Sequence, residues 1–571
     1  RVDDGAAAGV LAALAVGDQA AIERPDWEVF RVTGVAHLMS ISGLHVTMFA
    51  WLAALAIGRA WRLSPRLMLA WPAPLAARWG GLALAAGYAL LAGWGVPAQR
   101  TVGMIAVVAL LRTSGVRWPQ PLVLLTAGLA VVAADPWALL QPGFWLSFVA
   151  VGVLIASDPV TVPAGAGGWR ATLRAAWHTQ VVATVGLAPL TLLFFQQVSV
   201  VGFVANLLAI PLVTLVVTPL ALLGMLLPWL WPLAALAVQG LSAGLTALAT
   251  WPWAVWTAAA APVWAGVAGL VGGVLLVLPL PWRLRLLGLP LLLPLLLPPL
   301  PRPAPGRFEA VVADVGQGTA VLVRTRNRLL VYDTGPQISP EADAGTRVLL
   351  PLLRARGETT IDRLVLSHQD SDHVGGAAAL LAALPVHATS SSLPADHPLQ
   401  PRLPASTPCR AGQRWVWDGV DFEMLHPTPA DDARGARSNA LSCVLRVRGA
   451  DGRALLLTGD IEAPQEAALV ERLGLALRSE WLLVPHHGSR TSSSAAFLDA
   501  VAPRLALVQA AYRSRFGHPA ADVLARHAER GIALQRSDRC GAFTLPADDS
   551  AGVCERERRR RYWHHRDSPI P

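Results

Sequence analysis

The chain has 571 residues, of which 54% are apolar and only 15% are charged, with a formal net charge of +9 and a mean hydropathy of +0.45. These values exclude a soluble, a disordered and a collagen-like protein, and they favour a polytopic membrane protein. All 47 basic residues are arginines, which we interpret as a coding bias. The chain begins with Arg1 rather than Met and shows no signal-peptide pattern, so we expect a segment upstream of it.

The charged residues divide the chain into two halves. Residues 1–306 contain 15 Arg and 8 acidic residues, whereas residues 307–571 contain 32 Arg and 30 acidic residues. No Asp, Glu, Lys or Arg occurs between Ala175 and Trp282, and so long an uncharged apolar run requires a bilayer. We predict four parts: a membrane domain of about ten helices, a Pro-rich linker, a soluble domain and a basic tail, over residues 1–300, 301–307, 308–550 and 551–571.

Ten apolar runs are predicted to cross the membrane: 43–58, 79–94, 101–114, 120–134, 143–157, 178–196, 200–227, 232–250, 262–281 and 284–299. The Arg-rich turns follow the first, third, fifth and ninth runs, and therefore lie on one side, which should be the cytoplasm. They contain Arg59, Arg62, Arg66, Arg112, Arg117, Arg170, Arg174, Arg283 and Arg285. After an even number of crossings, we expect the soluble half to lie outside the cytoplasm.

Four polar residues in the membrane half differ from lipid-facing residues: His45, Gln99, Arg100 and Asn206. Polar groups within a membrane are costly and usually face a water-filled path or a protein partner. The alternative is that each forms an interhelical hydrogen bond that stabilises the bundle. For the set as a whole we favour a polar pathway.

In the soluble half, a predicted buried strand over 363–367 precedes a run of four potential metal ligands. These are His368, Asp370, Asp372 and His373, and four nitrogen and oxygen ligands within six residues can hold two adjacent divalent ions. Three further predicted strands end in polar groups of the same kind. They deliver Asp333, Asp460 and the pair His486–His487. Strand ends that converge on one edge are a common way to assemble a metal centre.

Four cysteines, Cys409, Cys443, Cys540 and Cys554, lie far apart and form no C-x-x-C motif. Their spacing therefore predicts neither a disulfide framework nor a thiolate metal site.

Both halves of the chain contain motifs through which they resemble known protein families. The half from about Phe308 onward resembles a metallo-β-lactamase-fold hydrolase, an αββα sandwich with two metals at one edge. The usual H-x-H-x-D-H run has Asp370 in place of its second histidine, as in the ComEC family of competence proteins. Matching motifs elsewhere are 37–46 (HLMSISGLHV), 96–100 (VPAQR), 142–148 (PGFWLSF), 206–211 (NLLAIP), 314–318 (DVGQG) and 516–519 (FGHP).

This resemblance implies a DNA-uptake channel that passes a single strand through the membrane half, while the hydrolase half degrades the complementary strand of a duplex. It implies metal ligands at His368, Asp370, Asp372, His373, Asp460 and His486 or His487. It implies catalytic roles for Asp372, His487 and His518, and supporting roles behind the ligands for Asp333, Asn439 and Ser489. A DNA receptor and a cytoplasmic helicase are the implied partners.

The chain departs from the family pattern in two places. Ser438 stands where members commonly show the first of two asparagines, which puts the role of Asn439 in question. The usual upstream part with its OB-like domain is absent from this chain, so that either the chain is a fragment or another chain guides the DNA.

For the reaction, two divalent ions would lower the pKa of a bridging water and clamp the phosphate. We assign Asp372 as a ligand that also orients the hydroxide, and His518 as the donor to the phosphate or leaving group. The carboxylate at Asp370 favours Mn²⁺ or Mg²⁺ over Zn²⁺, which remains possible. The residues Arg558 to Arg561, with Tyr562 and Trp563, are interpreted as a solvated tail or as a nucleic-acid contact.

Two other functions are weighed against the nuclease channel. In one, the helices only anchor a phosphodiesterase that acts on a lipid-linked or envelope substrate, and an anchor has no need of the polar membrane residues. In the other, the hydrolase half is inactive, which the complete ligand set disfavours.

Overall fold

The computed structural model describes residues 2–115, 118–157, 168–339, 342–433, 437–548 and 550–565. Arg117, which was used to orient the membrane domain, and residues 566–571 of the predicted tail lie outside this part. The chain divides into two compact units, Arg1–Pro299 and Leu300–Pro571. They are described one at a time.

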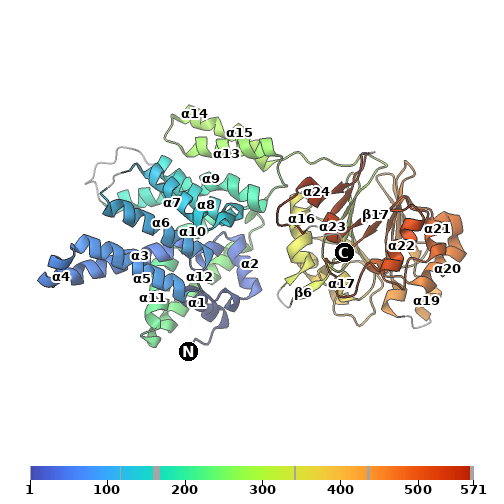
Figure 1. The fold of residues 1–571 in the computed structure, drawn as a ribbon, viewed down its shortest axis with the longest axis horizontal. Coiled ribbons are helices and arrows are strands. Elements are labelled where there is room, and N and C mark those ends of the chain that lie inside the picture. Colours follow the sequence, from blue (N-terminus) through green and yellow to red (C-terminus); the bar gives the residue numbers. More distant parts are fainter. Residues whose placement is uncertain are drawn as a thin grey trace. The chain divides into compact units, whose positions relative to one another are not determined.

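The first unit is a helical bundle with one small two-stranded sheet (Figure 1). Every run predicted as a crossing overlaps one or more of its helices. The helices are α1 (Gly5–Val16), α2 (Arg24–Val32), α3 (Gly43–Arg62), α4 (Pro65–Ala70), α5 (Ala73–Leu91), α6 (Val96–Thr113), α7 (Gln120–Ala134), α8 (Pro142–Ser157), α9 (Trp169–Phe195), α10 (Gly202–Leu212), α11 (Thr218–Gly224), α12 (Trp231–Ala249), α13 (Val263–Val277), α14 (Trp282–Leu286) and α15 (Gly288–Leu296), and β1 (Gln197–Ser199) pairs with β2 (Val255–Thr257).

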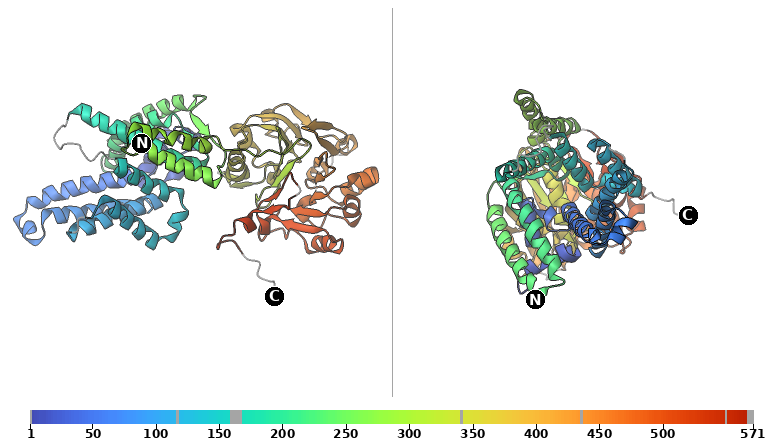
Figure 2. Two further views of the ribbon diagram at one scale, coloured as in Figure 1. Left: turned by 90° about the horizontal axis from the view of Figure 1, so that it is seen from above. Right: turned by 90° about the vertical axis from the view of Figure 1, so that its left-hand side faces the viewer.

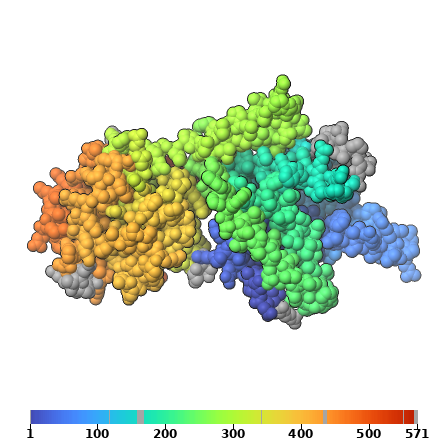
Figure 3. Space-filling model, turned by 180° about the vertical axis from the view of Figure 1, so that it is seen from behind, coloured from blue at the N-terminus to red at the C-terminus, as the bar shows by residue number. Residues whose placement is uncertain are grey.

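Within the described residues, four helical segments are long and apolar enough to cross a membrane. They are Ala36–Arg62, Trp169–Phe195, Gly202–Gly224 and Pro228–Ala249, and four further apolar helices are shorter. Long helices α3 and α5 lie side by side in both ribbon views (Figures 1 and 2). Helix α13 packs against α15, and the pair lies along the surface of the unit (Figure 3). The chain is a membrane protein.

Helix α1 was not predicted, although it is part of the core of this unit. Its residues Val10, Leu11 and Leu14 are buried in a cluster that also contains side chains of α10, α11 and α12. An apolar run of 12 residues is shorter than a crossing, and such runs are typical of buried core helices. Asp4 caps the helix, because its carboxylate accepts from the backbone N–H groups of Ala6 and Ala7.

The four predicted pathway residues lie on three helices. His45 on α3 is fully buried, Arg100 on α6 is 7% exposed, and Asn206 on α10 is half-buried. Gln99 is partly exposed, and its amide nitrogen donates to the carbonyl of Trp94 at 2.7 Å. All four are among the described residues, and no hydrogen bond joins any two of them.

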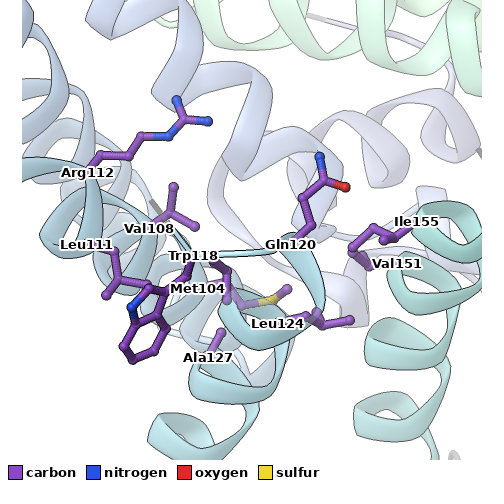
Figure 4. A pocket seen from close by; sticks show the side chains of 11 residues that line it. Met104, Val108, Leu111, Arg112, Trp118, Gln120, Leu124, Ala127, Val151 and Ile155 are labelled. Carbon is purple, nitrogen blue, oxygen red and sulfur yellow. The ribbon is translucent and has the colours of Figure 1, made fainter. Parts of the chain in front are cut away.

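A cavity of about 420 Å³ lies between α6, α7 and α8 (Figure 4). Its walls are mainly apolar, from residues such as Met104, Leu124 and Ile155, while Arg112 and Gln120 supply the polar groups. None of the four predicted pathway residues is among the residues that line this cavity.

The second unit contains two large sheets. The first has the order β10-β9-β8-β5-β4-β3-β18-β19 and the second β11-β12-β13-β14-β15-β16-β17. In the first sheet β5, β8, β9 and β10 run parallel, and in the second β14, β15, β16 and β17 do. The bounds are β3 (Glu309–Val312), β4 (Val321–Arg324), β5 (Leu329–Tyr332), β8 (Ile361–Leu366), β9 (Val386–Ser391), β10 (Ser406–Pro408), β18 (Phe543–Leu545) and β19 (Val553–Cys554), then β11 (Arg414–Trp417), β12 (Val420–His426), β13 (Val444–Arg448), β14 (Ala454–Leu457), β15 (Trp481–Leu483), β16 (Leu505–Val508) and β17 (Ala533–Arg536), with β6 (Gln337–Ser339) and β7 (Ala342–Asp343) as a separate pair.

The layers follow from which side chains are buried. One core joins the two sheets, with Tyr332 and Val365 from the first and Leu455 from the second. The outer face of each sheet packs against helices, so every residue of β14 is buried, as expected for a strand that is covered on both faces. The helices are α16 (Leu350–Ala355), α17 (Ser371–Val374), α18 (Ala377–Ala383), α19 (Pro429–Ala433), α20 (Ala463–Leu473), α21 (Ala495–Val501), α22 (Ala521–Glu529), α23 (Ser537–Cys540) and α24 (Glu555–Arg558). The result is the predicted αββα sandwich.

The prediction of no disulfide framework was wrong. Cys409 is bonded to Cys443, and Cys540 to Cys554. The sequence separations of 34 and 14 residues have no recognisable motif, because the pairs meet only through tertiary structure. Cys554 belongs to β19, which pairs with β18, so part of the range predicted as a tail is a strand of the first sheet.

Replacement of Cys409 and Cys443 together by serine should destabilise the second unit. Closing a loop of this length restricts the unfolded chain by about 3 to 4 kcal/mol. Thermal unfolding of the full chain in detergent, followed by differential scanning fluorimetry, should show a lower midpoint for the unit, with a slightly smaller shift for the shorter Cys540–Cys554 loop. Unchanged midpoints in both double variants would contradict this expectation.

Candidate metal centre

The candidate site lies where the carboxyl ends of parallel strands from both sheets meet. Asp333 follows β5 and Ser367–His368 follow β8 in the first sheet. Asp460 follows β14 and His487 follows β15 in the second. Because parallel strands end at the same edge, residues distant in sequence are brought together there.

Asp333 organises the ligands of the first sheet from behind. Its backbone is left-handed, with φ of 56°, and its carboxylate accepts the backbone N–H and the hydroxyl of Ser367, both at 2.7 Å. The Nδ1–H of His373 donates to the same carboxylate at 2.8 Å. The Nδ1 of His368 lies 3.0 Å from the Ser367 hydroxyl, which completes the network. Both imidazoles are thereby held with Nε2 directed away from the network.

Three imidazoles and one carboxylate converge without bonding to one another. His368 Nε2, His373 Nε2, Asp460 Oδ1 and His487 Nε2 are all buried, and none has a hydrogen-bond partner among the described residues. His373 Nε2 lies 3.2 Å from Asp460 Oδ1, yet these atoms are not aligned as donor and acceptor. Buried polar atoms are normally paired, and His368, His373 and Asp460 bring their ligand atoms within 4.8 Å of one another, an arrangement that fits a divalent cation.

A second group of potential ligands adjoins the first. His487 Nε2 lies 3.3 Å from a carboxylate oxygen of Asp372, and its Nδ1–H donates to the backbone carbonyl of Gln509 at 2.9 Å. Two sets of ligand atoms lie close enough to hold an ion, namely His368–His373–Asp460 and Asp372–His373–His487. Both sets contain His373, whose Nδ1–H is bonded to Asp333 and whose Nε2 can bind only one ion, so the residues present fit a divalent-metal centre.

The turn that carries Asp372 depends on a glycine. The backbone carbonyl of Asp372 accepts from the N–H of Thr319 at 3.0 Å. A Cβ added at Gly318 would lie 2.3 Å from that oxygen, which no side chain tolerates. The motif at 314–318 is therefore needed to position this ligand.

The pKa values at this edge respond to the close packing of opposite charges. Burial opposes protonation of His373, but the carboxylates of Asp460 and Asp333 outweigh it and raise its pKa well above the usual value. The pKa of His487 is raised for the same kind of reason, by Asp460 and Asp372. Burial also opposes ionisation of Asp460, yet the neighbouring imidazoles hold its pKa well below the usual value. Without a cation, protons therefore take its place, and a cation would displace them.

His486 and His487 occupy different environments. Both have left-handed backbones, with φ of 52° and 53°, and this strained turn directs only His487 into the buried cluster. His486 is 20% exposed, and its Nδ1 lies 3.2 Å from both Thr491 and Glu462. Its Nε2 is 3.8 Å from Asp460, too far for a direct contact.

The other predicted residues lie at varying distances from the cluster. Asp370 is 45% exposed and lies 3.7 Å from His368 Nε2. The hydroxyl of Ser489 contacts that of Thr491 at 3.1 Å, and the Ser489 backbone N–H donates to the carbonyl of His486 at 2.8 Å. Asn439 is half-buried in a short 3-10 turn, and its side chain forms no hydrogen bond with a described residue. Ser442, which follows that turn, is the polar group that reaches the centre, because its hydroxyl accepts the N–H of Asp460 at 3.1 Å and lies 3.4 Å from His368 Nδ1.

His518 lies beside the ligands, with ring centroids 5.8 Å from His486 and 6.3 Å from His487. Burial and the neighbouring His487 and His486 lower its pKa, so this ring is neutral at pH 7. Gln317 contacts this ring. Its carbonyl oxygen accepts from Ala511 N–H and Ser514 Oγ, which turns the amide nitrogen toward His518 Nδ1 at 3.5 Å. A donor amide beside Nδ1 favours the tautomer with the proton on Nε2. Gln317 was quoted only as part of a motif, and its role was missed.

Replacement of Asp333 by asparagine should weaken metal binding by about 10- to 100-fold, because it removes the charge that orients His373. Mn²⁺ affinity of the full chain, measured by isothermal titration calorimetry, tests this. Asp362→Asn is the matched control, since Asp362 lies in β8 near the opposite end of the strand and pairs with Arg328. Equal affinities for the wild type and D333N would contradict the role assigned to Asp333.

Replacement of His487 by alanine should remove at least one bound ion per chain, whereas H486A should retain both. The reason is that only His487 presents an unpaired buried Nε2 to the cluster. Metal content of the purified variants by mass spectrometry distinguishes the two. Loss of metal from H486A alone would show that His486 is the ligand.

Comparison with known families agrees with the two units. The model of the competence protein family matches residues 14–283, and that of the metallo-beta-lactamase superfamily matches residues 313–511. The second unit is thus a metal-dependent hydrolase domain by fold and by its candidate ligands.

Three curated relatives are similar along almost the whole chain. Competence protein ComA of Neisseria gonorrhoeae is 38% identical over 94% of this chain and 74% of its own length. The uncharacterized protein YcaI of Escherichia coli is 33% identical over 91% of this chain and 68% of its own. Recombination protein 2 of Haemophilus influenzae is 28% identical over 91% of this chain and 69% of its own. On this similarity, which includes both units in their order, the chain belongs to the ComEC family of competence proteins.

Proposed function

We propose that this protein takes up DNA, passing one strand through the membrane unit while the hydrolase unit cleaves phosphodiester bonds of the other. The observation that carries the proposal is the set of buried, unpaired ligand atoms at the edge of a hydrolase fold, in a chain whose other unit matches the competence protein model. A phosphodiester is the bond that a two-ion site of this kind suits best.

In the proposed hydrolase, two divalent ions would supply a nucleophile at neutral pH and neutralise charge on the phosphate. His368, His373, Asp460, His487 and Asp372 would hold them, with Asp370 at the exposed rim. Mn²⁺ or Mg²⁺ is favoured by the carboxylates, and Zn²⁺ by the imidazoles. Asp372 is 32% exposed, so its second oxygen can accept a hydrogen bond from the attacking water. His518 donates Nε2–H to a phosphate oxygen.

The membrane unit offers polar groups that an anchor would not need. His45 Nε2, two guanidinium nitrogens of Arg100 and Asn206 Oδ1 are buried and lack a hydrogen-bond partner among the described residues. The same holds for the hydroxyls of Thr214, which lies within a π-helical turn at 213–217, and Thr218, which directly follows that turn. Unpaired polar groups inside a membrane bundle favour a hydrated or ligand-bearing path, and they support transport over simple anchoring.

The disulfides support a hydrolase unit outside the cytoplasm. Disulfides persist in the periplasm and on cell surfaces, and they are rare in the reducing cytoplasm. Both bonds lie in the second unit, and the distribution of arginines likewise favours the outer side of an inner membrane for this unit. In this arrangement an external receptor delivers the duplex, and a cytoplasmic helicase draws in the single strand.

The proposal predicts that the full chain in nanodiscs cleaves DNA in Mn²⁺ and not in EDTA. D372A should lower the rate at least 100-fold, because it removes both a ligand and the group that orients the water. D362A, at the other end of the site's sheet, is the control and should cleave at the wild-type rate. Gel analysis of end-labelled single-stranded and duplex DNA measures these rates.

A folded, Mn²⁺-loaded protein that cleaves neither DNA form would contradict the nuclease proposal. If the same sample hydrolysed a lipid-linked phosphodiester, the function of a membrane-anchored phosphodiesterase would replace the nuclease proposal.

A further inference from the structure

A loop beside the metal centre carries four exposed side chains for which the proposed hydrolysis has no use. This Arg-aromatic loop, which we define as Tyr512–Phe516, follows β16 and leads directly to His518. Phe516 is 55% exposed and Tyr512 is 46% exposed, and Arg513 and Arg515 are exposed as well. Large aromatic rings are rarely left in water at the entrance to a site unless they bind something.

Each of the two arginines lies over one of the two rings. The guanidinium carbon of Arg515 lies 4.7 Å from the centroid of Phe516, and that of Arg513 lies 5.3 Å from the centroid of Tyr512. Within the described part of the chain, neither arginine forms an ion pair. Arg513 has a left-handed backbone, with φ of 53°, a conformation that costs about 1 kcal/mol or more and is retained mainly at functional sites. The loop therefore presents positive charge and aromatic faces together.

The loop is fixed to the metal centre rather than free of it. Gln317 accepts hydrogen bonds from Ala511 and Ser514 of this segment and contacts His518 through its amide nitrogen. The ring of Phe516 stacks on that of His518, with centroids 5.8 Å apart and planes at 29°. His518 in turn lies 6.3 Å from His487. Phe516 is thus two ring contacts away from a metal-binding imidazole.

Tyr512 is partly covered. The ring of His565 stacks on it at 3.8 Å with the planes at 25°, so one of its faces is taken by the C-terminal segment. Phe516 is also contacted, by the His518 ring and by the Arg515 guanidinium over it. Its exposed fraction is nevertheless the larger of the two, and it is the main candidate for a new stacking contact.

We propose that the Arg-aromatic loop binds unpaired bases of a DNA strand next to the phosphodiester that is cleaved. This inference rests on the proposed nuclease function and refines its substrate. A base stacks on Phe516, while Arg513 and Arg515 contact the flanking phosphates, a combination typical of sites for single-stranded nucleic acid. Bases inside a duplex already have both faces stacked, so the loop selects a single strand or a frayed end over intact duplex.

Three strands test the proposal with the full chain in nanodiscs: oligothymidylate, an abasic strand of the same length and a blunt duplex. All three carry fluorescein and cleavage-resistant phosphorothioate linkages, and dissociation constants come from fluorescence anisotropy in Mn²⁺. F516L should bind oligothymidylate on the order of 10- to 100-fold more weakly, and should bind the abasic strand as the wild type does. F516W should retain wild-type affinity for both.

The arginines should behave differently from Phe516. The double change Arg513→Gln and Arg515→Gln should weaken binding of both single strands and lower the salt dependence by about 1.4 in the log–log slope, the value for two phosphates of a single strand. Arg504→Gln is the matched control, because Arg504 is 85% exposed and lies just before β16, at the end of the strand opposite the loop.

The proposal is overturned if F516L binds oligothymidylate as tightly as the wild type does. It is also overturned if F516L loses as much affinity for the abasic strand, or for the blunt duplex, as it loses for oligothymidylate. Failure of the nuclease is a separate result. A chain that binds oligothymidylate through Phe516 but cleaves no unmodified strand contradicts the nuclease and leaves the binding site supported.

Discussion

The hydrolase unit depends on one electrostatic constraint: the charge of its buried imidazoles and carboxylates must be balanced, by protons when no metal is bound and by a divalent cation when one is. His368, His373, Asp460 and His487 carry four buried atoms without a hydrogen-bond partner among the described residues, and all four residues belong to the two groups that could hold a metal ion. Each imidazole is held from behind by a hydrogen bond at Nδ1, to Ser367, Asp333 or the backbone of Gln509. Desolvation of these groups costs several kcal/mol unless an ion compensates, so the surrounding fold serves to position them.

The two sheets meet that constraint by their topology. Parallel strands of each sheet end at the same edge, and the apolar core between the sheets fixes their separation there. The Cys409–Cys443 disulfide also supports the site. Cys409 directly follows β10 of the first sheet, and Cys443 directly follows Ser442, whose hydroxyl contacts His368 and Asp460. The membrane unit follows a different rule, since its helices are apolar on nearly every face and only isolated polar groups are buried among them.

Much of this architecture could be predicted because the signals are local. The uncharged run from Ala175 to Trp282 indicates a membrane, and the cluster from His368 to His373 after a strand indicates a metal. Other features depend on contacts that a sequence does not display. The disulfides arise from strands that meet only in the fold, and α1 is too short to be recognised as a membrane helix. The different roles that the geometry favours for His486 and His487 follow from two left-handed residues in succession, which spacing alone does not reveal. Gln317 acts across nearly two hundred residues of sequence, on a loop that no motif connects to it.

The central claim is that the unpaired ligand atoms hold two adjacent ions. The most direct measurement is an anomalous difference map at the manganese absorption edge from crystals of the Mn²⁺-loaded protein. The account predicts two peaks about 3.5 to 4 Å apart, one beside His368 and Asp460 and the other beside Asp372 and His487. A map without peaks at the strand ends that carry these residues, or with a single peak bound by His486 and Asp370, would contradict the account.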